Sequence, residues 1–428
     1  MTSTEAFLAA MLAIIAIPYL VWRLGRTDHY APLVVVQIIV GILLGPGVFG
    51  AWFPAAHHEL FDTGVMASLN GLAWWGVMLF VWTAGIELHT SQLWREWRDT
   101  TVTASLALGV PLLLGAAAAA CLLAFPGWRG ASAAPWQFVA GIGMSCAITA
   151  LPILVLFMER LAILRHPLGQ RVLRYASFDD IAIWGVLAVI LADWDRIGWQ
   201  AGFLVLFAAC TVAIRQLMPR IPEADRWHVG LVWLAGSGWL ADWFGFHYMV
   251  GAFLSGAVLD ARWFNQVHLD RFRQALLLTV MPVFFLSTGL RTSWTIAGAG
   301  VMAVAAVLLT VSVVGKLTGV ALAARLLGWP KGEAAVIGWL LQTKALIMLI
   351  FASILLDRGI VTPQTFTALL LMAIGSTMLT IPVVTPRWLR LEASRRSRHG
   401  LEVIAPAPGQ GRDKVAQPPT LELTDKEP

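Results

Sequence analysis

Long apolar stretches recur along the chain, and short polar connections separate them. Each is near or above the ~18–20 residues that a helix needs to cross roughly 30 Å of hydrocarbon. This pattern predicts about 13 membrane-spanning helices and an all-α polytopic membrane protein. The predicted spans are residues 6–22, 32–50, 66–88, 101–125, 135–159, 172–192, 198–214, 228–244, 246–259, 275–290, 296–324, 334–356 and 364–386.

Composition argues against a water-soluble protein. Hydrophobic residues make up 58% of the chain and charged residues only 13%, whereas soluble domains carry about 25% charged residues. We therefore expect residues 1–387 to form a transmembrane domain that contacts the lipid bilayer. After residue 387 the sequence becomes polar, charged and Pro-rich. Such a segment cannot bury a core, so residues 388–428 are expected to be a disordered cytoplasmic tail.

The net charge of +5 is distributed unevenly among the connections between predicted spans. Alternate connections hold Arg23 and Arg26, Arg95 and Arg98, Arg160, Arg165, Arg171 and Arg174, Arg215, Arg220 and Arg226, Arg262, Arg271 and Arg273, Arg325 and Lys331, and the run from Arg387 to Arg398. The other side has Arg129, Arg196, Arg291 and Arg358. The positive-inside rule then places the N-terminus outside and the C-terminus in the cytoplasm of a cell (inner) membrane. The basic residues indicate topology and anionic headgroups, and no nucleic-acid partner is expected.

Two predicted spans carry polar or helix-breaking residues at their centres. These residues are Ser145, Thr149 and Pro152 in the fifth span, and Gln342, Thr343 and Lys344 in the twelfth. Irregular backbone at membrane depth survives only where it is buried or lines a cavity. Interrupted segments at corresponding places in two halves of a chain indicate a transporter site built from inverted repeats. The twelfth span lacks a proline, so its interruption rests on the polar residues alone.

Two adjacent carboxylates, Asp179 and Asp180, lie inside the sixth predicted span. Each carboxylate costs roughly 2.5–3.5 kcal/mol at the centre of a membrane helix, so a pair indicates function. Adjacent residues point about 100° apart on a helix, and the two side chains should have different partners. Crowded like charges favour proton binding by one of them. A carboxylate that binds either a proton or a monovalent cation is a simple device for exchange. Alternatively, one aspartate caps a helix that begins at Ser177, which leaves the second acid unexplained.

Two lysines lie deep in other spans and need negative partners. Lys316 is expected to pair with Asp179 or Asp180, the acids placed at similar depth; its alternative is to extend its amine to an interface. Lys344 is expected to neutralise the carbonyl end of a half-helix at the break. The alternative is that Lys344 has an unrecognised partner. Acids near span ends are expected to be ordinary interfacial residues: Glu87, Asp242, Asp260 and Glu333.

No enzyme chemistry is expected from the sequence. It contains no nucleophile–base set, phosphate-binding loop or metal cluster. The three cysteines lie inside apolar segments at unrelated spacings and indicate neither a disulfide framework nor a metal site. We therefore expect no metal and no cofactor.

Eight short motifs occur in a fixed order along the chain. They are GILLGPGVFG (41–50), LFVWTAGIEL (79–88), SCAITALPIL (145–154), ASFDDIAIW (176–184), GAFLSG (251–256), MPVFFLSTGL (281–290), GKLTGVALAARLLG (315–328) and QTKALIMLI (342–350). With them, residues 30 to 385 resemble the monovalent cation:proton antiporter-2 family, which includes Kef-type and plant cation/proton exchangers. The resemblance rests on the order of all eight motifs, with the aspartate pair and the GK motif at the expected spans.

This resemblance implies a fold and a site. The fold would have two inverted repeats, a core domain and a dimerisation domain that forms a homodimer, with two discontinuous crossing helices that contain Thr149 and Thr343. Asp180 would carry the ion and the proton, near Ser145 and Thr149, and Asp179 would pair with Lys316. The protein would exchange Na⁺ or K⁺ for protons electrogenically, through an elevator-like movement.

Three departures from the family pattern concern ion preference and coupling rather than the fold. Gln37 stands where an acid is frequent, Cys146 interrupts a stretch of usually small or β-branched residues, and QTKAL lacks a glycine after its basic residue. Two rival functions also remain. One is a gated potassium-efflux pathway, as in Kef-type relatives, and the other is an ion sensor that transports nothing.

Overall fold

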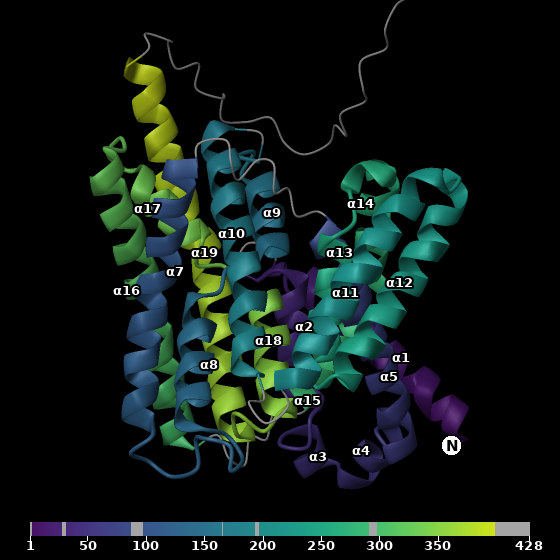
Figure 1. The fold of residues 1–428 in the computed structure, drawn as a ribbon. Coiled ribbons are helices and arrows are strands. Elements are labelled where there is room, and N and C mark those ends of the chain that lie inside the picture. The colour runs from purple at the N-terminus through teal and green to yellow at the C-terminus, as the bar shows by residue number, and fades with distance from the viewer. Residues whose placement is uncertain are drawn as a thin grey trace, which may run out of the picture. The chain divides into compact units, whose positions relative to one another are not determined.

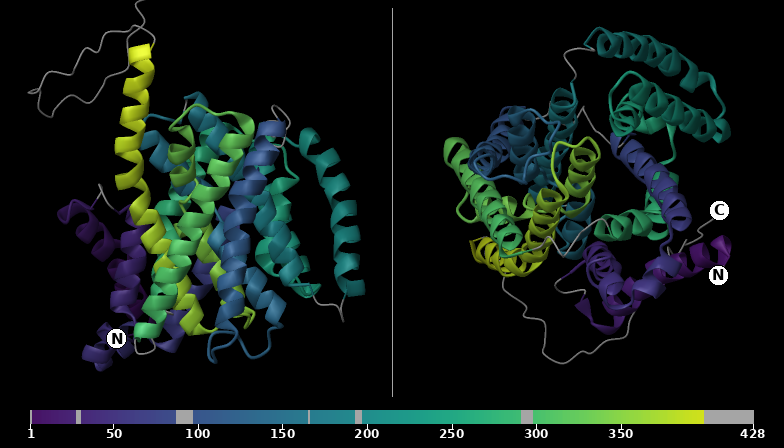
Figure 2. Two further views of the ribbon diagram at one scale, coloured as in Figure 1. Left: turned by 90° about the vertical axis from the view of Figure 1, so that its left-hand side faces the viewer. Right: turned by 90° about the horizontal axis from the view of Figure 1, so that it is seen from below.

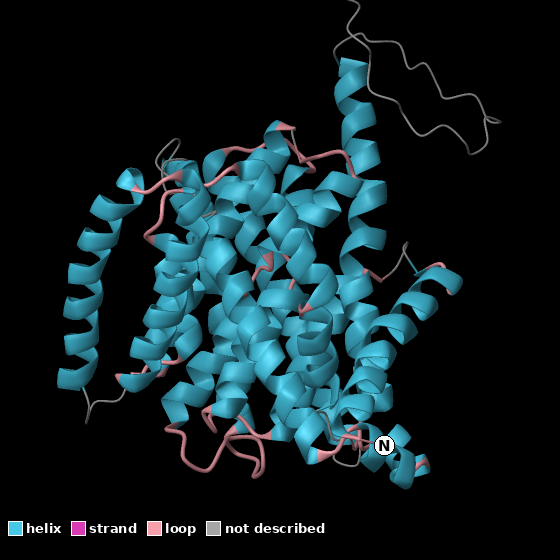
Figure 3. Ribbon diagram, turned by 90° about the vertical axis from the view of Figure 1, so that its right-hand side faces the viewer, coloured by secondary structure: helices cyan, strands magenta, loops and turns pink. Residues whose placement is uncertain are grey.

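The computed structural model describes residues 2–27, 31–86, 97–164, 166–192, 197–290 and 298–398. Within these ranges the named elements are all helices, and one isolated bridge pairs Arg129 with Val361. Figure 3 shows helices throughout, with loops at their ends and a few short loop segments among them. The α-helices are α1 Ser3–Leu24, α2 Leu33–Leu44, α3 Phe49–Trp52, α4 Pro54–Leu60, α5 Thr63–Ile86, α7 Trp97–Leu122, α8 Pro135–Ala147, α9 Leu151–Arg160, α10 Pro167–Ile190, α11 Ile197–Leu217, α12 Glu223–Trp243, α13 Tyr248–Ala257, α14 Gln266–Thr279, α15 Met281–Leu290, α16 Ala299–Leu327, α17 Glu333–Leu340, α18 Ala345–Asp357 and α19 Pro363–Arg398.

Each range predicted to span the membrane is occupied by one helix or by two consecutive helices. In the described residues, eight helices are long and apolar enough to cross a bilayer, or nine if the bent pair of α17 and α18 is one span. These findings confirm an all-helical, multi-pass membrane architecture. The exact number of crossings stays a prediction.

The alternative that an aspartate caps a helix beginning at Ser177 is wrong. Helix α10 begins at Pro167, with His166 as its N-cap, so Asp179 and Asp180 lie well inside a helix and neither caps its start. The compact unit ends at Trp388, next to the predicted boundary, but helix α19 continues to Arg398, so residues 388–398 are helical and not disordered as predicted. Leucine, arginine, glutamate and alanine dominate residues 388–398, and all four favour helix strongly enough to extend one that has already formed. Residues 399–428 lie outside the described part of the chain.

Residues Met1–Trp388 form one compact unit, and its helices make two groups. In the core group, α7 packs on α8, α10 and α16, while α16 packs on α17 and α10 contacts α9. Helix α19 joins this group through hydrogen bonds to the α17–α18 connection. The flanking group comprises α1–α5 and α11–α15, in which α13 packs on α5 and α12, and α15 packs on α2. Figure 1 shows the labelled core helices beside one another and the flanking helices to one side, and the view from below in Figure 2 shows the same separation.

Polar contacts brace the core group at both ends. At one end, the loop before α8 pairs with the loop before α19: Gly130 N donates to Ile360 O over 3.0 Å, and the Thr365 hydroxyl donates to Trp128 O over 2.6 Å. At the other end, Arg171 of α10 donates to Glu333 of α17 over 2.8 Å and lies 3.6 Å from Asp99 of α7.

The prediction that Glu333 is an ordinary interfacial acid is therefore wrong. It is buried in the first turn of α17 and paired with Arg171, a partner from a distant part of the chain that the sequence does not indicate. Asp242 and Asp260 are more accessible, as predicted. Glu87 lies outside the described residues.

The flanking group relies on close backbone approach at two of the glycine-containing motifs. A Cβ atom on Gly256 of α13 would lie 2.1 Å from the carbonyl oxygen of Trp82 in α5. A Cβ on Gly41 of α2 would lie 2.5 Å from Leu286 O of α15. Small residues allow such approach between membrane helices. The two motifs thus fix helix pairs within this group.

Candidate functional site

Two helix breaks meet inside the core group. The first, residues 148–150, separates α8 from α9, and the second, residues 341–344, separates α17 from α18. Pro152 falls in the first turn of α9, where a residue without an N–H costs least. Ala150 N donates to Thr343 O over 2.6 Å, so each break supplies a partner for the other. Both predicted interruptions are present, including the one that lacks proline.

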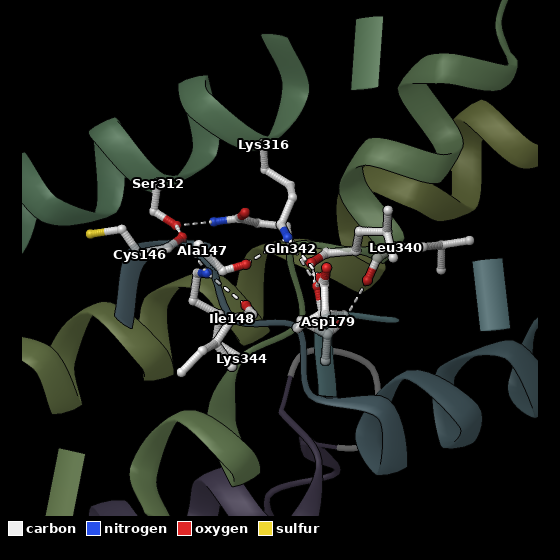
Figure 4. Close-up of polar contacts among 12 residues, drawn as sticks. Cys146, Ala147, Ile148, Asp179, Ser312, Lys316, Leu340, Gln342 and Lys344 are labelled. Atoms are coloured by element: carbon white, nitrogen blue, oxygen red, sulfur yellow. Dashed lines mark hydrogen bonds and ion pairs between the residues drawn. The ribbon is translucent and has the colours of Figure 1, made fainter. Parts of the chain in front are cut away.

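Three side chains donate hydrogen bonds to the carbonyl groups at the end of α8. Lys344 Nζ donates to Cys146 O over 2.7 Å and to Ile148 O over 2.8 Å. Lys316 Nζ donates to Ala147 O over 2.6 Å, and the Ser312 hydroxyl donates to Cys146 O over 2.7 Å. Figure 4 shows these contacts converging on the break. The last carbonyls of a helix lack partners within it and carry partial negative charge, and two ammonium groups here offset that charge. The predicted contact of Lys344 with a half-helix end is thus present.

Asp179 has a fixed set of partners. Its Oδ2 atom lies 3.1 Å from Lys316 Nζ and 2.6 Å from the Thr149 hydroxyl. Lys316 is fully buried and its amine is bonded inside the core group, so the alternative that it extends to an interface is wrong. The Asp179–Lys316 ion pair therefore links α10 to α16, next to the first break. Its part in transport stays a prediction.

Asp180 differs from its neighbour. The residue is only 8% exposed, and the described part of the chain gives its carboxylate no hydrogen bond or ion pair. The Oδ1 atom of Asp179 is likewise buried without a partner, but its Oδ2 atom is bonded to Lys316 and Thr149. The helical turn points the two adjacent carboxylates in different directions, so Asp180 does not share the contacts of Asp179. A buried carboxylate without compensation is strongly unfavourable. Chemically, such a group is stabilised by taking up a proton or a cation.

The remaining predicted residues have mainly supporting contacts. The Ser145 hydroxyl donates to Gly141 O in its own helix, and the Thr343 hydroxyl donates to Leu340 O. Gln342 Nε2 donates to Ser312 over 3.0 Å. No contact with either aspartate is present for Ser145 among the described residues, and its role as an ion ligand stays a prediction.

Three supporting residues were not identified from the sequence. The Ser312 hydroxyl donates to Cys146 O at the end of α8 and accepts from Gln342 Nε2 in the second break. Ser376 donates to Gln342 O over 2.6 Å, and Thr377 accepts from Ala345 N over 3.1 Å. Ser312 precedes Lys316 by four residues, a spacing that places both on one helix face and could have revealed it. The residues of α19 carry no comparable local signal.

Known proteins resemble the chain in both sequence and fold. Residues 8–390 match the family described as "Sodium/hydrogen exchanger, transmembrane". The Na(+)/H(+) antiporter NhaS4 of Synechocystis is 27% identical over 88% of this chain and 96% of its own length. Cation/H(+) antiporter 19 of Arabidopsis thaliana is 28% identical over 82% of this chain and 46% of its own length, so the chain spans under half of that relative. K(+)/H(+) antiporter 1 of Saccharomyces cerevisiae is 26% identical over 82% of this chain and 43% of its own length.

The fold also matches a solved structure. The sodium proton antiporter MjNhaP1 from Methanocaldococcus jannaschii aligns with a TM-score of 0.63 at 14% identity, over 92% of this chain and 99% of that one. The described helices thus follow a fold that a known antiporter adopts. The family match extends over most of the chain and includes both breaks, the aspartate pair and both buried lysines. This chain belongs to the transmembrane sodium/hydrogen exchanger family.

Proposed function

We propose that this protein exchanges a monovalent cation, Na⁺ or K⁺, for protons, with Asp180 binding the two in turn. The observation that carries the proposal is the buried Asp180 carboxylate, which makes no hydrogen bond or ion pair among the described residues, whereas Asp179 is paired with Lys316 through its Oδ2 atom. An uncompensated charge at this depth is costly, so a proton or a cation must neutralise it. Because one carboxylate serves both, their binding is mutually exclusive, and this competition couples the two fluxes. The relatives named as Na⁺/H⁺ and K⁺/H⁺ antiporters support this reading.

The neighbouring groups would have separate roles in this mechanism. Lys316 and Thr149 hold Asp179 in place, so it would maintain the geometry of α10 rather than carry the ion. Thr149 would also offer its oxygen near the ion site, with Ser145 one helical turn earlier on α8. Lys344 would offset the partial negative charge of the carbonyl groups at the end of α8 throughout the transport cycle.

Alternating access would arise from movement of the core group against the flanking group. The described charged residues that are buried all lie in the core group, which is braced by hydrogen bonds. Aromatic packing such as the Trp184–Phe253 stack, with ring centroids 5.0 Å apart, lies between the groups. Movement between apolar surfaces costs less free energy than movement across a hydrogen-bonded interface, because it breaks no hydrogen bonds. This elevator-like movement would take place in a homodimer, each subunit of which crosses the cell (inner) membrane about 13 times, with its N-terminus outside and its C-terminus in the cytoplasm.

The exchange of protons for cations is tested in proteoliposomes with an imposed pH gradient. Wild-type protein should accumulate the cation against its own gradient, and Asp180→Asn should abolish this flux. Asp270→Asn is the matched control, because Asp270 is an exposed acid of the flanking group whose ion pair with Arg273 lies within α14. Undiminished exchange by Asp180→Asn would exclude Asp180 as the carrier. Repeating the assay with Na⁺, K⁺ and Li⁺ identifies the cation.

The same assay separates antiport from the rival functions. A gated potassium-efflux pathway passes ions only down their electrochemical gradient, so uphill transport driven by the pH gradient excludes it. A sensor that transports nothing would bind the cation but show no flux in any condition. Voltage dependence tests electrogenicity: Lys316→Gln should weaken it, and unchanged dependence would reject the Asp179–Lys316 pair as a coupling element.

A further inference from the structure

A cavity of about 290 Å³ lies where α10 of the core group meets α11 and α13 of the flanking group. Its wall comes from the end of α10 (Ala188, Val189, Ala192), the start of α11 (Gln200, Ala201, Phe203, Leu204) and the region of α13 (Phe246, Val250, Leu254). Nine of these ten residues are apolar. The cavity is separate from the aspartate pair and has no part in the proposed binding of ions.

Water is a poor occupant for this cavity. A single water needs roughly 10–15 Å³ and two to four polar partners, and the volume here is many times larger. Gln200 provides the one polar side chain among the described residues that form the wall. A chain of waters would therefore lose most of its hydrogen bonds, so the wall selects an apolar occupant.

The surroundings identify where an apolar occupant comes from. Val189 and Leu204, which lie in the wall, are each more than half exposed, so the cavity opens on the outer surface of the protein. Helix α11 is one of the helices long and apolar enough to cross a membrane, so this surface faces hydrocarbon. Trp199, also exposed, lies at the first turn of α11, where tryptophan typically marks the level of the headgroups.

We propose that this cavity binds an acyl chain of a bilayer phospholipid between the core group and the flanking group. The chain enters from the exposed side, beside Val189 and Leu204, and packs against Phe203 and Phe246. Its headgroup lies near the start of α11, at the level of Trp199. Because the acyl chain comes from the bilayer and not from water, close packing of its methylene groups against the wall drives the binding.

The position of the cavity gives the lipid a second effect, which rests on the proposed function. The wall residue Ala188 is eight residues beyond Asp180 on the same helix, or about 12 Å along its axis. An acyl chain held between α10 and α13 stabilises the arrangement of the two groups in which the cavity exists. Movement of the core group would then require the chain to leave or to shift, so occupancy sets the rate of exchange.

Lipid binding is tested with a phospholipid that carries a photoactivatable diazirine on its acyl chain. The purified full-length protein in detergent is titrated with this lipid, irradiated, and analysed by peptide mapping. Saturable labelling should concentrate on the ends of α10 and α11 that form the wall, and excess unlabelled phospholipid should compete. Ala188→Trp and, from the opposite wall, Ala201→Phe should lose this labelling. Val205→Trp is the control, because Val205 is exposed on α11 outside the wall.

Several outcomes overturn the proposal. Uniform labelling of all lipid-facing helices, or undiminished labelling in both filled variants, excludes a specific site. Competition by free fatty acid but not by phospholipid would show that the occupant is not a phospholipid.

Labelling does not depend on ion exchange, so Asp180→Asn should label like wild type even if the proposed transport is wrong. In proteoliposomes, Ala188→Trp should slow exchange and Val205→Trp should not. Equal rates in the two variants would reject the coupling of lipid to transport.

Discussion

The core group and the flanking group solve the problem of packing membrane helices by different means. In the core group, broken helices leave carbonyl ends at membrane depth, and buried side chains supply their partners: Lys316 and Lys344 on α8, and Ser376 on the second break. In the flanking group, the helices that carry glycine motifs approach each other until backbone meets backbone, as at Gly256 and Trp82. The first arrangement creates a polar interior at membrane depth, and the second creates an apolar support of closely packed helices. The comparison teaches that the polar residues which appear costly in the sequence are the ones that assemble the site.

The largest effect on stability is expected from removal of the buried cation that pairs with Asp179. Lys316→Gln leaves the Asp179 charge buried without its main partner, and breaking a buried pair in this way costs about 3–5 kcal/mol. We expect a marked fall in the melting temperature of the purified protein. If the core group is held by compensated charge, Asp179→Asn combined with Lys316→Gln should recover much of the loss. A double variant as unstable as Lys316→Gln alone would contradict this account, and the exposed Lys331→Gln serves as control.

An intermediate effect is expected when a methyl group is added between two flanking helices. Gly256→Ala places a Cβ 2.1 Å from the carbonyl oxygen of Trp82, which forces α5 and α13 apart. Overpacking of this kind typically costs about 1–3 kcal/mol. Gly236→Ala, in α12, is the matched control, because no atom lies within 4 Å of its added Cβ. Equal melting temperatures for the two variants would show that close approach does not hold this group together.

The smallest effect on stability is expected at a polar link between the groups. Arg358, which follows α18, donates to Phe246 O over 2.7 Å and lies 3.6 Å from Asp242, with the two side chains 33% and 61% exposed. Exposed pairs contribute about 0–1 kcal/mol, so Arg358→Gln should barely change the melting temperature. Because this link joins the core group to the flanking group, the rate of exchange should nevertheless change.

Arg262→Gln provides the control for that measurement, because it removes an exposed pair with Asp260 inside the flanking group alone. If both variants leave the exchange rate unchanged, Arg358 does not restrain movement between the groups. If Arg358→Gln lowers the melting temperature as far as Lys316→Gln does, the division into two groups joined by a weak link is wrong.

The sequence predicts the local features of this fold well. Apolar length locates the helices, and polar residues at membrane depth locate both breaks, the aspartate pair and the buried lysines. Each of these signals lies within one span, because an unfavourable residue in hydrocarbon is conspicuous wherever its partner lies.

The partners themselves are harder to predict. Glu333 resembles any acid at a helix end, and only its contact with Arg171, far away in the sequence, reveals that it is buried. Ser376 is one serine among many, and its hydrogen bond to Gln342 O depends on how α19 packs against the second break. The C-terminal end of α19 differs from the prediction for another reason. The sequence loses its apolar residues near position 387, but a helix already formed continues through residues that favour it.

The Thr149 hydroxyl faces two acceptors, Asp179 Oδ2 at 2.6 Å and Leu341 O at 2.8 Å, and it also accepts from Lys316. A hydroxyl has a single hydrogen, so it can donate to one of these two oxygens at a time. While Asp179 is ionised, the hydrogen is best placed on the carboxylate. A change in the charge of Asp179 would turn the hydroxyl toward the backbone of the second broken helix. The Thr149 hydroxyl would thus couple the charge of Asp179 to a hydrogen bond at the second break. Thr149→Ser keeps the hydroxyl and should preserve this coupling, whereas Thr149→Val removes the hydroxyl and should abolish it.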